Sequence, residues 1–162
     1  MKIPVTLNEE KIIIDESPDT FLRESLRNSG ILSIKEGCEK GRCGSCTVLL
    51  DGKPVSSCIL PTAIVKDCKI ITLEHFIKTK DGQDIQKGFA TAGINLCGFC
   101  NASRYFSTYA LLNKSYKPTQ EELEETANSI ECSCIDKKNF IAGILYATAN
   151  KHEREGRKNV LI

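Results

Sequence analysis

Two groups of four cysteines, each drawn from short stretches of chain, constrain this 162-residue sequence more than any other feature. The first group spans residues 38–58, with spacers of four, two and eleven residues, and the second joins a CxxC at 97–100 to a CxC at 132–134. Their members are Cys38, Cys43, Cys46 and Cys58, and Cys97, Cys100, Cys132 and Cys134. In a reducing compartment, thiols at this density indicate bound metal or redox chemistry rather than disulfides.

The first group carries the more specific spacing. Its CxxxxCxxC opening resembles that of plant-type 2Fe-2S ferredoxins, in which a loop holds one side of the cluster and a distant strand supplies the last ligand. Gly37, Gly41 and Gly44 lie among these cysteines, and we expect them to let backbone N–H groups approach the sulfurs and to adopt positive φ angles. Zinc is the alternative, but zinc sites typically pair two short CxxC knuckles, which this run does not match. The pattern predicts a 2Fe-2S cluster.

The second group is ambiguous when it is taken alone. A CxxC with a remote CxC suits zinc and an iron–sulfur cluster about equally, and a redox-active CxxC is a weaker third interpretation. Cys68, the ninth cysteine, has no partner in either group. We expect it to be a free thiol in or beside a strand.

Composition excludes several classes of function. The formal net charge is +1 and 41% of the residues are hydrophobic, so the chain can form a core and is not typical of a nucleic-acid binder. Residues 1–16 alternate apolar and charged side chains, unlike a signal peptide or a membrane span. These features predict a globular cytoplasmic protein with no nucleic-acid or membrane partner.

The first part of the chain has strand-like patterns around one short helix. Alternation before and after Asn8 predicts a hairpin, and a second hairpin is expected at the turn pair Asp51-Gly52. Leu22 and Leu26, followed by Gly30, predict a short helix, and residues 69–73 predict a last strand.

From about residue 83 the apolar spacing becomes helical and predicts four short helices. Thr119 and Glu122 form a predicted capping box, and Asp136 is expected to cap the last helix. The polar stretch 78–84 is interpreted as a linker. The fold class is therefore predicted as α+β, with domains at residues 1–78 and 79–162.

Taken together, the motifs resemble the small iron–sulfur subunit of the molybdenum hydroxylases, the family of xanthine dehydrogenase, aldehyde oxidoreductase and carbon monoxide dehydrogenase. The resemblance rests on GCEKGRCGSCTVLLDGKPVSSC, on CGFC and on the later CxC, in family order, and covers nearly the whole chain. It implies a ferredoxin-like β-grasp domain followed by a four-helix-bundle domain, each holding one 2Fe-2S cluster. In that arrangement Cys38, Cys43, Cys46 and Cys58 bind the cluster near the flavin. Cys97, Cys100, Cys132 and Cys134 bind the one that faces the molybdenum cofactor.

The resemblance also implies an electron-transfer role in an oxidoreductase complex. Electrons would pass from a molybdopterin-binding large subunit through both clusters to a medium subunit that binds FAD, and neither of those cofactors would bind this chain. The sequence contains no dinucleotide-binding glycine pattern, no P-loop and no nucleophile–base set. We therefore expect no catalytic residues here, and substrate chemistry on a partner.

The sequence departs from the family around the second group. A glutamine commonly precedes the CGxC motif and contacts the pterin, whereas this chain has Leu96, and the family's CRCTGY becomes CSCIDK. We hypothesise that both clusters form while the contact with the pterin is altered. These departures leave open a free-standing two-cluster ferredoxin or redox adaptor. The ambiguous spacing of the second group leaves open a weaker alternative, one cluster with a structural zinc in the helical half.

Overall fold

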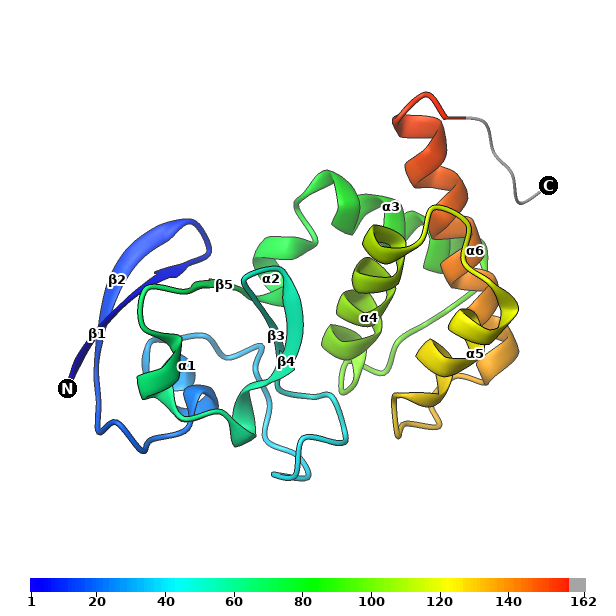
Figure 1. Cartoon of the computed structure of the whole chain (residues 1–162). Coiled ribbons are helices and arrows are strands. Elements are labelled where there is room, and N and C mark those ends of the chain that lie inside the picture. Colours follow the sequence, from blue (N-terminus) through cyan, green and yellow to red (C-terminus); the bar gives the residue numbers. More distant parts are fainter. Residues whose placement is uncertain (158–162) are drawn as a thin grey trace.

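The computed structural model describes residues 1–157 and separates into a sheet-containing half and a helical half that pack side by side (Figure 1). The last five residues of the predicted helical domain lie outside the described residues. Within residues 1–157, no helix is long and apolar enough to cross a membrane. Mixed α+β architecture is as predicted.

Five short strands form one mixed sheet in the order β2-β1-β5-β3-β4. They are β1 (Lys2–Leu7), β2 (Glu10–Asp15), β3 (Thr47–Leu50), β4 (Lys53–Ser56) and β5 (Lys69–Ile71). β1 and β5 run parallel, and the other neighbours are antiparallel. Parallel pairing of the first and last strands at the centre of the sheet is the arrangement of a β-grasp fold, as expected.

Both hairpin turns follow from local sequence. Asn8 and Glu9 have φ angles of 50° and 73°, and Asp51 and Gly52 have φ angles of 47° and 80°. Two successive positive φ angles define the tight turn whose twist matches that of paired strands, and Asn, Asp and Gly adopt them most readily. These turns fix the registers Leu7↔Glu10 and Leu50↔Lys53.

A single helix, α1 (Leu22–Asn28), packs under the sheet. Leu22 and Leu26 are fully buried on the face it turns to the strands, where they join Ile3 and Ile70. Two 3₁₀ turns, η1 (Ser57–Ile59) and η2 (Thr62–Val65), lead from β4 to β5. Because η1 contains Cys58, the fourth cysteine of the first group is held on a buried turn rather than on a strand.

The helical half contains α2 (Leu73–Phe76), α3 (Lys80–Thr91), α4 (Asn101–Lys114), α5 (Gln120–Asn128) and α6 (Lys137–Arg154). The last four correspond to the four predicted helices. The capping box at the start of α5 is present, because the Thr119 side chain accepts from the Glu122 N–H and Glu122 accepts from the Thr119 N–H. Asp136 caps α6 by accepting from the N–H of Asn139 at 2.9 Å. Both predicted caps are confirmed.

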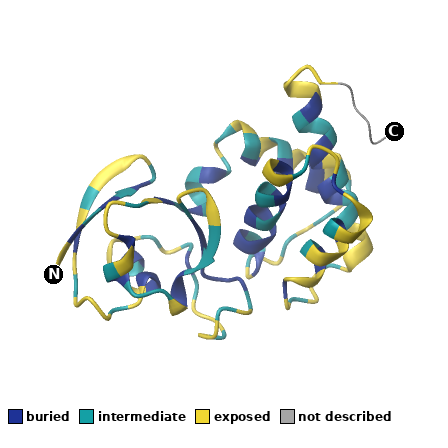
Figure 2. Cartoon of the chain, viewed as in Figure 1, coloured by how far each residue is buried: buried dark blue, intermediate teal, exposed yellow. Residues whose placement is uncertain are grey.

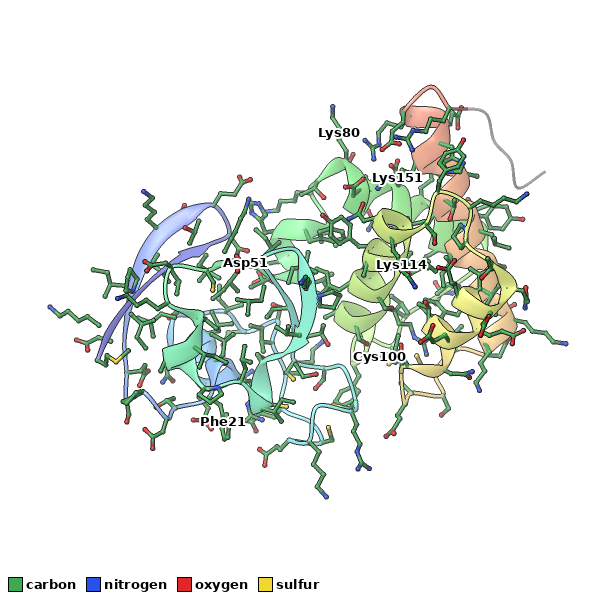
Figure 3. The ribbon with its side chains drawn as sticks, in the orientation of Figure 1. Phe21, Asp51, Lys80, Cys100, Lys114 and Lys151 are labelled. Carbon is green, nitrogen blue, oxygen red and sulfur yellow. The ribbon has the colours of Figure 1, made fainter. Side chains whose placement is uncertain are left out.

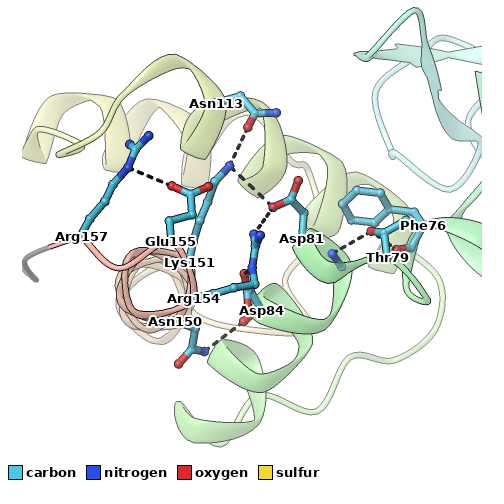
Figure 4. Close-up of polar contacts among 11 residues, drawn as sticks. Phe76, Thr79, Asp81, Asp84, Asn113, Asn150, Lys151, Arg154, Glu155 and Arg157 are labelled. Atoms are coloured by element: carbon cyan, nitrogen blue, oxygen red, sulfur yellow. Dashed lines mark hydrogen bonds and ion pairs between the residues drawn. The ribbon is translucent and has the colours of Figure 1, made fainter.

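The interpretation of residues 78–84 as a linker was wrong. Thr79 is the N-cap of α3 and accepts from the N–H of Gly82, so most of this polar stretch is the first turn of a helix. Its acidic residues have partners on the last helix: Arg154 donates to Asp81 at 2.5 Å and to Asp84 at 2.6 Å (Figure 4). The segment is polar because it lies at the surface, where its acidic residues pair with α6.

One further sequence-based boundary, the end of the last strand, differs in the structure. The last strand ends at Ile71, and Leu73 already begins α2. Phe76 of α2 stacks edge-on against Phe106 and Tyr109 of α4, with ring centroids 5.2 and 5.0 Å apart. Residues just before position 78 therefore belong to the helical core, and the domain boundary at 78 stays a prediction.

The core of the helical half depends on a close crossing of α3 and α6. Each of α3, α4 and α6 carries buried residues (Figure 2), and these belong to one hydrophobic cluster. At the crossing, Gly88 of α3 lies directly on the backbone of Ala147, so that a Cβ at position 88 would be 2.4 Å from the Ala147 nitrogen. Only glycine permits this approach.

Replacing Gly88 with alanine therefore tests the crossing. In an exposed helix the change would stabilise by about 1 kcal/mol through helix propensity, but here we expect destabilisation of about 1–3 kcal/mol from overpacking. Urea unfolding followed by circular dichroism measures the change. Thr91→Ala, an exposed site on the same helix, is the control and should alter stability by less than about 0.5 kcal/mol. A more stable Gly88→Ala variant would contradict the close crossing.

Candidate metal centres

The first cysteine group is assembled by a loop and a turn at one edge of the sheet. Cys38, Cys43 and Cys46 lie in the irregular segment between α1 and β3, and Cys58 lies in η1. Cys46 and Cys58 are buried, whereas Cys38 and Cys43 are partly exposed. The site therefore has a wall on the sheet core and a rim near solvent.

Backbone N–H groups in this loop converge on sulfur. The N–H groups of Lys40, Arg42 and Cys43 donate to Cys38 Sγ at 3.4, 3.2 and 3.3 Å, and the N–H of Cys38 donates to Cys43 Sγ at 3.4 Å. Successive N–H groups pointing into one concavity form an anion-binding nest. The loop is thus arranged to hold negative charge on sulfur, which is what four thiolates around iron require.

Cys38 at the rim and Cys58 at the wall differ in acidity. The backbone N–H groups of Cys43, Lys40 and Arg42 lower the pKa of the Cys38 thiol to about 6. Burial raises the pKa of the Cys58 thiol to about 11. The rim cysteine is therefore a thiolate at neutral pH, whereas the wall cysteine ionises only when a cation replaces its proton.

The three glycines of this loop permit close packing in different ways. Gly41 and Gly44 have φ angles of 71° and 75°, as expected. Gly37 does not adopt a positive φ, so that part of the expectation was wrong. Its role is steric instead, because a Cβ at Gly37 would lie 2.5 Å from Cys43 Sγ. Glu39 is the third residue of this loop with a left-handed backbone, with a φ of 55°.

The second cysteine group comes from two loops at one end of the helices. Cys97 and Cys100 lie in the connection to α4, with Cys100 as its N-cap, so the CxxC opens α4. Cys132 and Cys134 lie in the turn before α6. The four sulfurs all lie within 4.8 Å of one another, and Cys100 Sγ is 3.4 Å from Cys134 Sγ. Sulfurs at this separation suit a shared metal or cluster.

Backbone geometry also favours thiolate charge in the second group. Gly98 has a φ of 82°, and the N–H groups of Phe99 and Cys100 lower the pKa of the Cys97 thiol to about 7. Burial raises the pKa of the Cys100 thiol to about 12. Cys97 and Cys134 are exposed and Cys100 is fully buried, so this group, too, has an open rim and a closed wall.

Sequence reasoning did not single out Arg104, which contacts both loops of the second group. Arg104 lies in the first turn of α4 and is 2% exposed. Its Nε donates to Cys100 Sγ at 3.4 Å, and its Nη2 donates to the carbonyl oxygen of Cys132 at 2.8 Å. The available signal was its position four residues after Cys100, on the same face of a helix.

The two cysteine groups meet through direct contacts between their loops. Gly44 of the first loop lies on Ser103 of α4, where a Cβ at Gly44 would be 2.2 Å from Ser103 Oγ. Ser103 Oγ in turn donates to the carbonyl oxygen of Cys100 at 2.9 Å. Lys35 Nζ donates to the carbonyl oxygen of Gly98. Figure 3 labels Cys100 at the end of α4 that faces the first loop.

Comparison with protein families identifies both halves. Residues 5–70 match the family described as 2Fe-2S iron-sulfur cluster binding domain. Residues 72–145 match the family described as 2Fe-2S binding domain. The second match favours a cluster over zinc in the helical half, a choice that the sequence pattern alone left open.

Full-length relatives are small subunits of oxidoreductases. The chain is 35% identical to the nicotinate dehydrogenase small FeS subunit of Eubacterium barkeri, over 90% of this chain and 95% of that one. It is 38% identical to the xanthine dehydrogenase iron-sulfur-binding subunit of Escherichia coli O157:H7, over 88% and 91%. A chain of the solved quinoline 2-oxidoreductase from Pseudomonas putida 86 superposes on this chain with a TM-score of 0.84 and 29% identity. The match covers 98% of this chain and 98% of that one.

The pKa difference between Cys38 and Cys58 predicts selective alkylation of the iron-free protein. At pH 7 Cys38, with a pKa of about 6, is mostly thiolate, whereas Cys58, with a pKa of about 11, stays protonated. Iodoacetamide should label Cys38 at least about tenfold faster, and this rate should rise between pH 5 and pH 7 while that of Cys58 stays low. Peptide mass spectrometry measures both rates. Equal rates would contradict the N–H nest around Cys38.

Proposed function

The chain belongs to the small iron–sulfur subunits of the molybdenum hydroxylase family, and on that premise we propose that it relays electrons from a molybdopterin-binding subunit to an FAD-binding subunit. Its relatives are named as subunits of xanthine and nicotinate dehydrogenases, which makes it an oxidoreductase subunit with two 2Fe-2S-binding domains. The relay, its direction and the partners are our proposal. We expect the assembly to be cytoplasmic.

The observation that carries this proposal is the contact between the two cysteine loops. Electron transfer through protein requires redox centres to be close together and fixed in position. Here Gly44 lies against Ser103, and Lys35 ties the CGFC loop to the first loop. These contacts would hold the two proposed cluster sites in fixed positions relative to each other. The contact at Gly44 leaves no room for a side chain.

The proposed ligands are the eight cysteines of the two groups. Cys38, Cys43, Cys46 and Cys58 would hold one cluster, and Cys97, Cys100, Cys132 and Cys134 the other. Each cluster, when bound, accepts and passes on one electron. The chain supplies thiolates, N–H donors and apolar walls that exclude water on one side, while the partly exposed rims leave an entry and an exit for electrons at partner surfaces.

The face beside Cys97 is the surface that we assign to the molybdopterin subunit. Leu96 packs against the helical core and offers no hydrogen bond. Leu96 lines a hollow of about 500 Å³ together with Asn95 and Asn101. We therefore keep the hypothesis that the pterin contact differs from that of relatives with glutamine before the CGxC motif. A complex in which a residue next to Leu96 makes the usual contact would contradict it.

Two measurements test the proposed function. The chain, isolated anaerobically, should contain about four irons and four acid-labile sulfides and give two distinct EPR signals on reduction. It should also co-purify with molybdopterin-binding and FAD-binding chains. Two irons with one zinc would contradict the second cluster, and a stable monomer that passes electrons to several unrelated acceptors would instead favour a free-standing ferredoxin.

Substituting one proposed ligand tests the order of the relay. Cys43→Ser should remove about half of the iron and one EPR signal, because a serine oxygen replaces one thiolate of the first group. In the assembled complex, substrate should still reduce the remaining cluster, whereas flavin reduction should be lost. Stopped-flow absorbance separates the two steps.

Cys68→Ser is the matched control for this substitution. Cys68 is partly buried, its thiol donates to the carbonyl oxygen of Lys66 at 3.7 Å, and it belongs to neither group. This variant should keep all of the iron and both signals. If Cys43→Ser kept both signals as well, our assignment of the first ligand set would be wrong.

A further inference from the structure

Arg104 is a buried cation for which the described chain provides no acidic partner. It is 2% exposed, and within residues 1–157 no carboxylate forms an ion pair with it. Glu131 and Asp136 line the same hollow of about 640 Å³ without pairing with it. Burying an unpaired charge is strongly unfavourable, so an anion beside this guanidinium would stabilise it.

The position of Arg104 near the start of a helix adds to the cost of burying its charge. It lies in the first turn of α4, where the helix dipole favours negative charge and disfavours a cation. The groups it contacts are the Cys100 sulfur, the Cys132 carbonyl oxygen and the Phe140 ring, whose centroid is 4.5 Å from Cζ. Of these, only the sulfur can carry a full negative charge, as a thiolate.

Arg23, the other buried arginine among the described residues, provides a contrast. Its Nη1 is 3.2 Å from a Glu39 carboxylate oxygen, and its Nη2 is 3.6 Å from one of Glu24. Its charge is therefore already balanced by the chain. Arg104 differs because its nearest anionic group would be a ligand of the second cluster.

We propose that Arg104 raises the reduction potential of the cluster held by the second cysteine group, acting through Cys100. This inference rests on the proposed function, because it requires a 2Fe-2S cluster at those four cysteines. Reduction adds one electron and one unit of negative charge to the cluster, and the guanidinium, which stays protonated, stabilises the more negative state. A higher potential makes this cluster a better acceptor of electrons from substrate oxidation.

The test is a redox titration of the intact holoprotein with dithionite, followed by EPR so that each cluster is read separately. Arg104→Met keeps a long side chain and removes the charge. We expect the reduction equilibrium of the second cluster to fall at least tenfold, a shift of about 59 mV to more negative potential for one electron. The potential of the first cluster should not change. Arg104→Lys should stay near the wild-type value.

Lys137→Met is the matched control. Lys137 lines the same hollow but is exposed, so solvent screens its charge and its removal should leave the potential unchanged. An unchanged potential in Arg104→Met, or equal shifts in Arg104→Met and Lys137→Met, would overturn the inference.

Two further variants keep the inference testable if Arg104→Met loses the second cluster. If Arg104→Met cannot hold it, Arg104→Gln and Arg104→Lys are compared instead: a negative shift in the glutamine variant alone supports the inference, and equal potentials overturn it. Failure of the proposed function is distinct, because the wild-type protein itself would then lack the second EPR signal.

Discussion

Concentrating negative charge on sulfur inside a protein is the constraint on which the rest of this structure depends. Burial alone opposes it, as the raised pKa values of Cys58 and Cys100 show. Backbone N–H groups that donate to the sulfurs of Cys38 and Cys97 offset this effect and lower the pKa of those two thiols. Those N–H groups can converge only where the backbone leaves regular structure, which explains why both cysteine groups lie on loops next to rigid elements and why residues there adopt left-handed φ angles.

Packing of the two halves against each other fixes the positions of the two cysteine groups. A loop rich in glycine has little structure of its own, and the first loop is fixed because it lies on α4 through Gly44 and Ser103. Arg104 ties the start of α4 to the Cys132 carbonyl, and Lys35 ties the CGFC loop that precedes α4 to the sheet half. One helix end thus positions both cysteine groups, so their relative placement does not depend on a flexible linker.

Sequence patterns predicted the features that depend on local chemistry. The hairpin turns at Asn8 and Asp51 and the caps at Thr119 and Asp136 are determined by residues within a few positions of each other. Interactions over long sequence distances were not predictable in this way. The polar pattern of segment 78–84 predicts a linker, because the partners of its acidic residues, Arg154 and Lys151, lie some seventy residues later. Arg104 was missed because its burial depends on Cys132 and Phe140.

The exposure of the second group gives a physical reason why this chain would benefit from the proposed assembly. Cys97 and Cys134 lie at the surface while Cys100 is buried, so one side of the site faces water and the other faces Arg104 and the helical core. Water on the open side screens the charge of Arg104 and weakens its effect on sulfur. A partner surface covering Cys97 and Cys134 would exclude that water and strengthen every electrostatic contact inside. In the proposed complex, subunit docking would therefore complete the site electrostatically without adding a ligand to it.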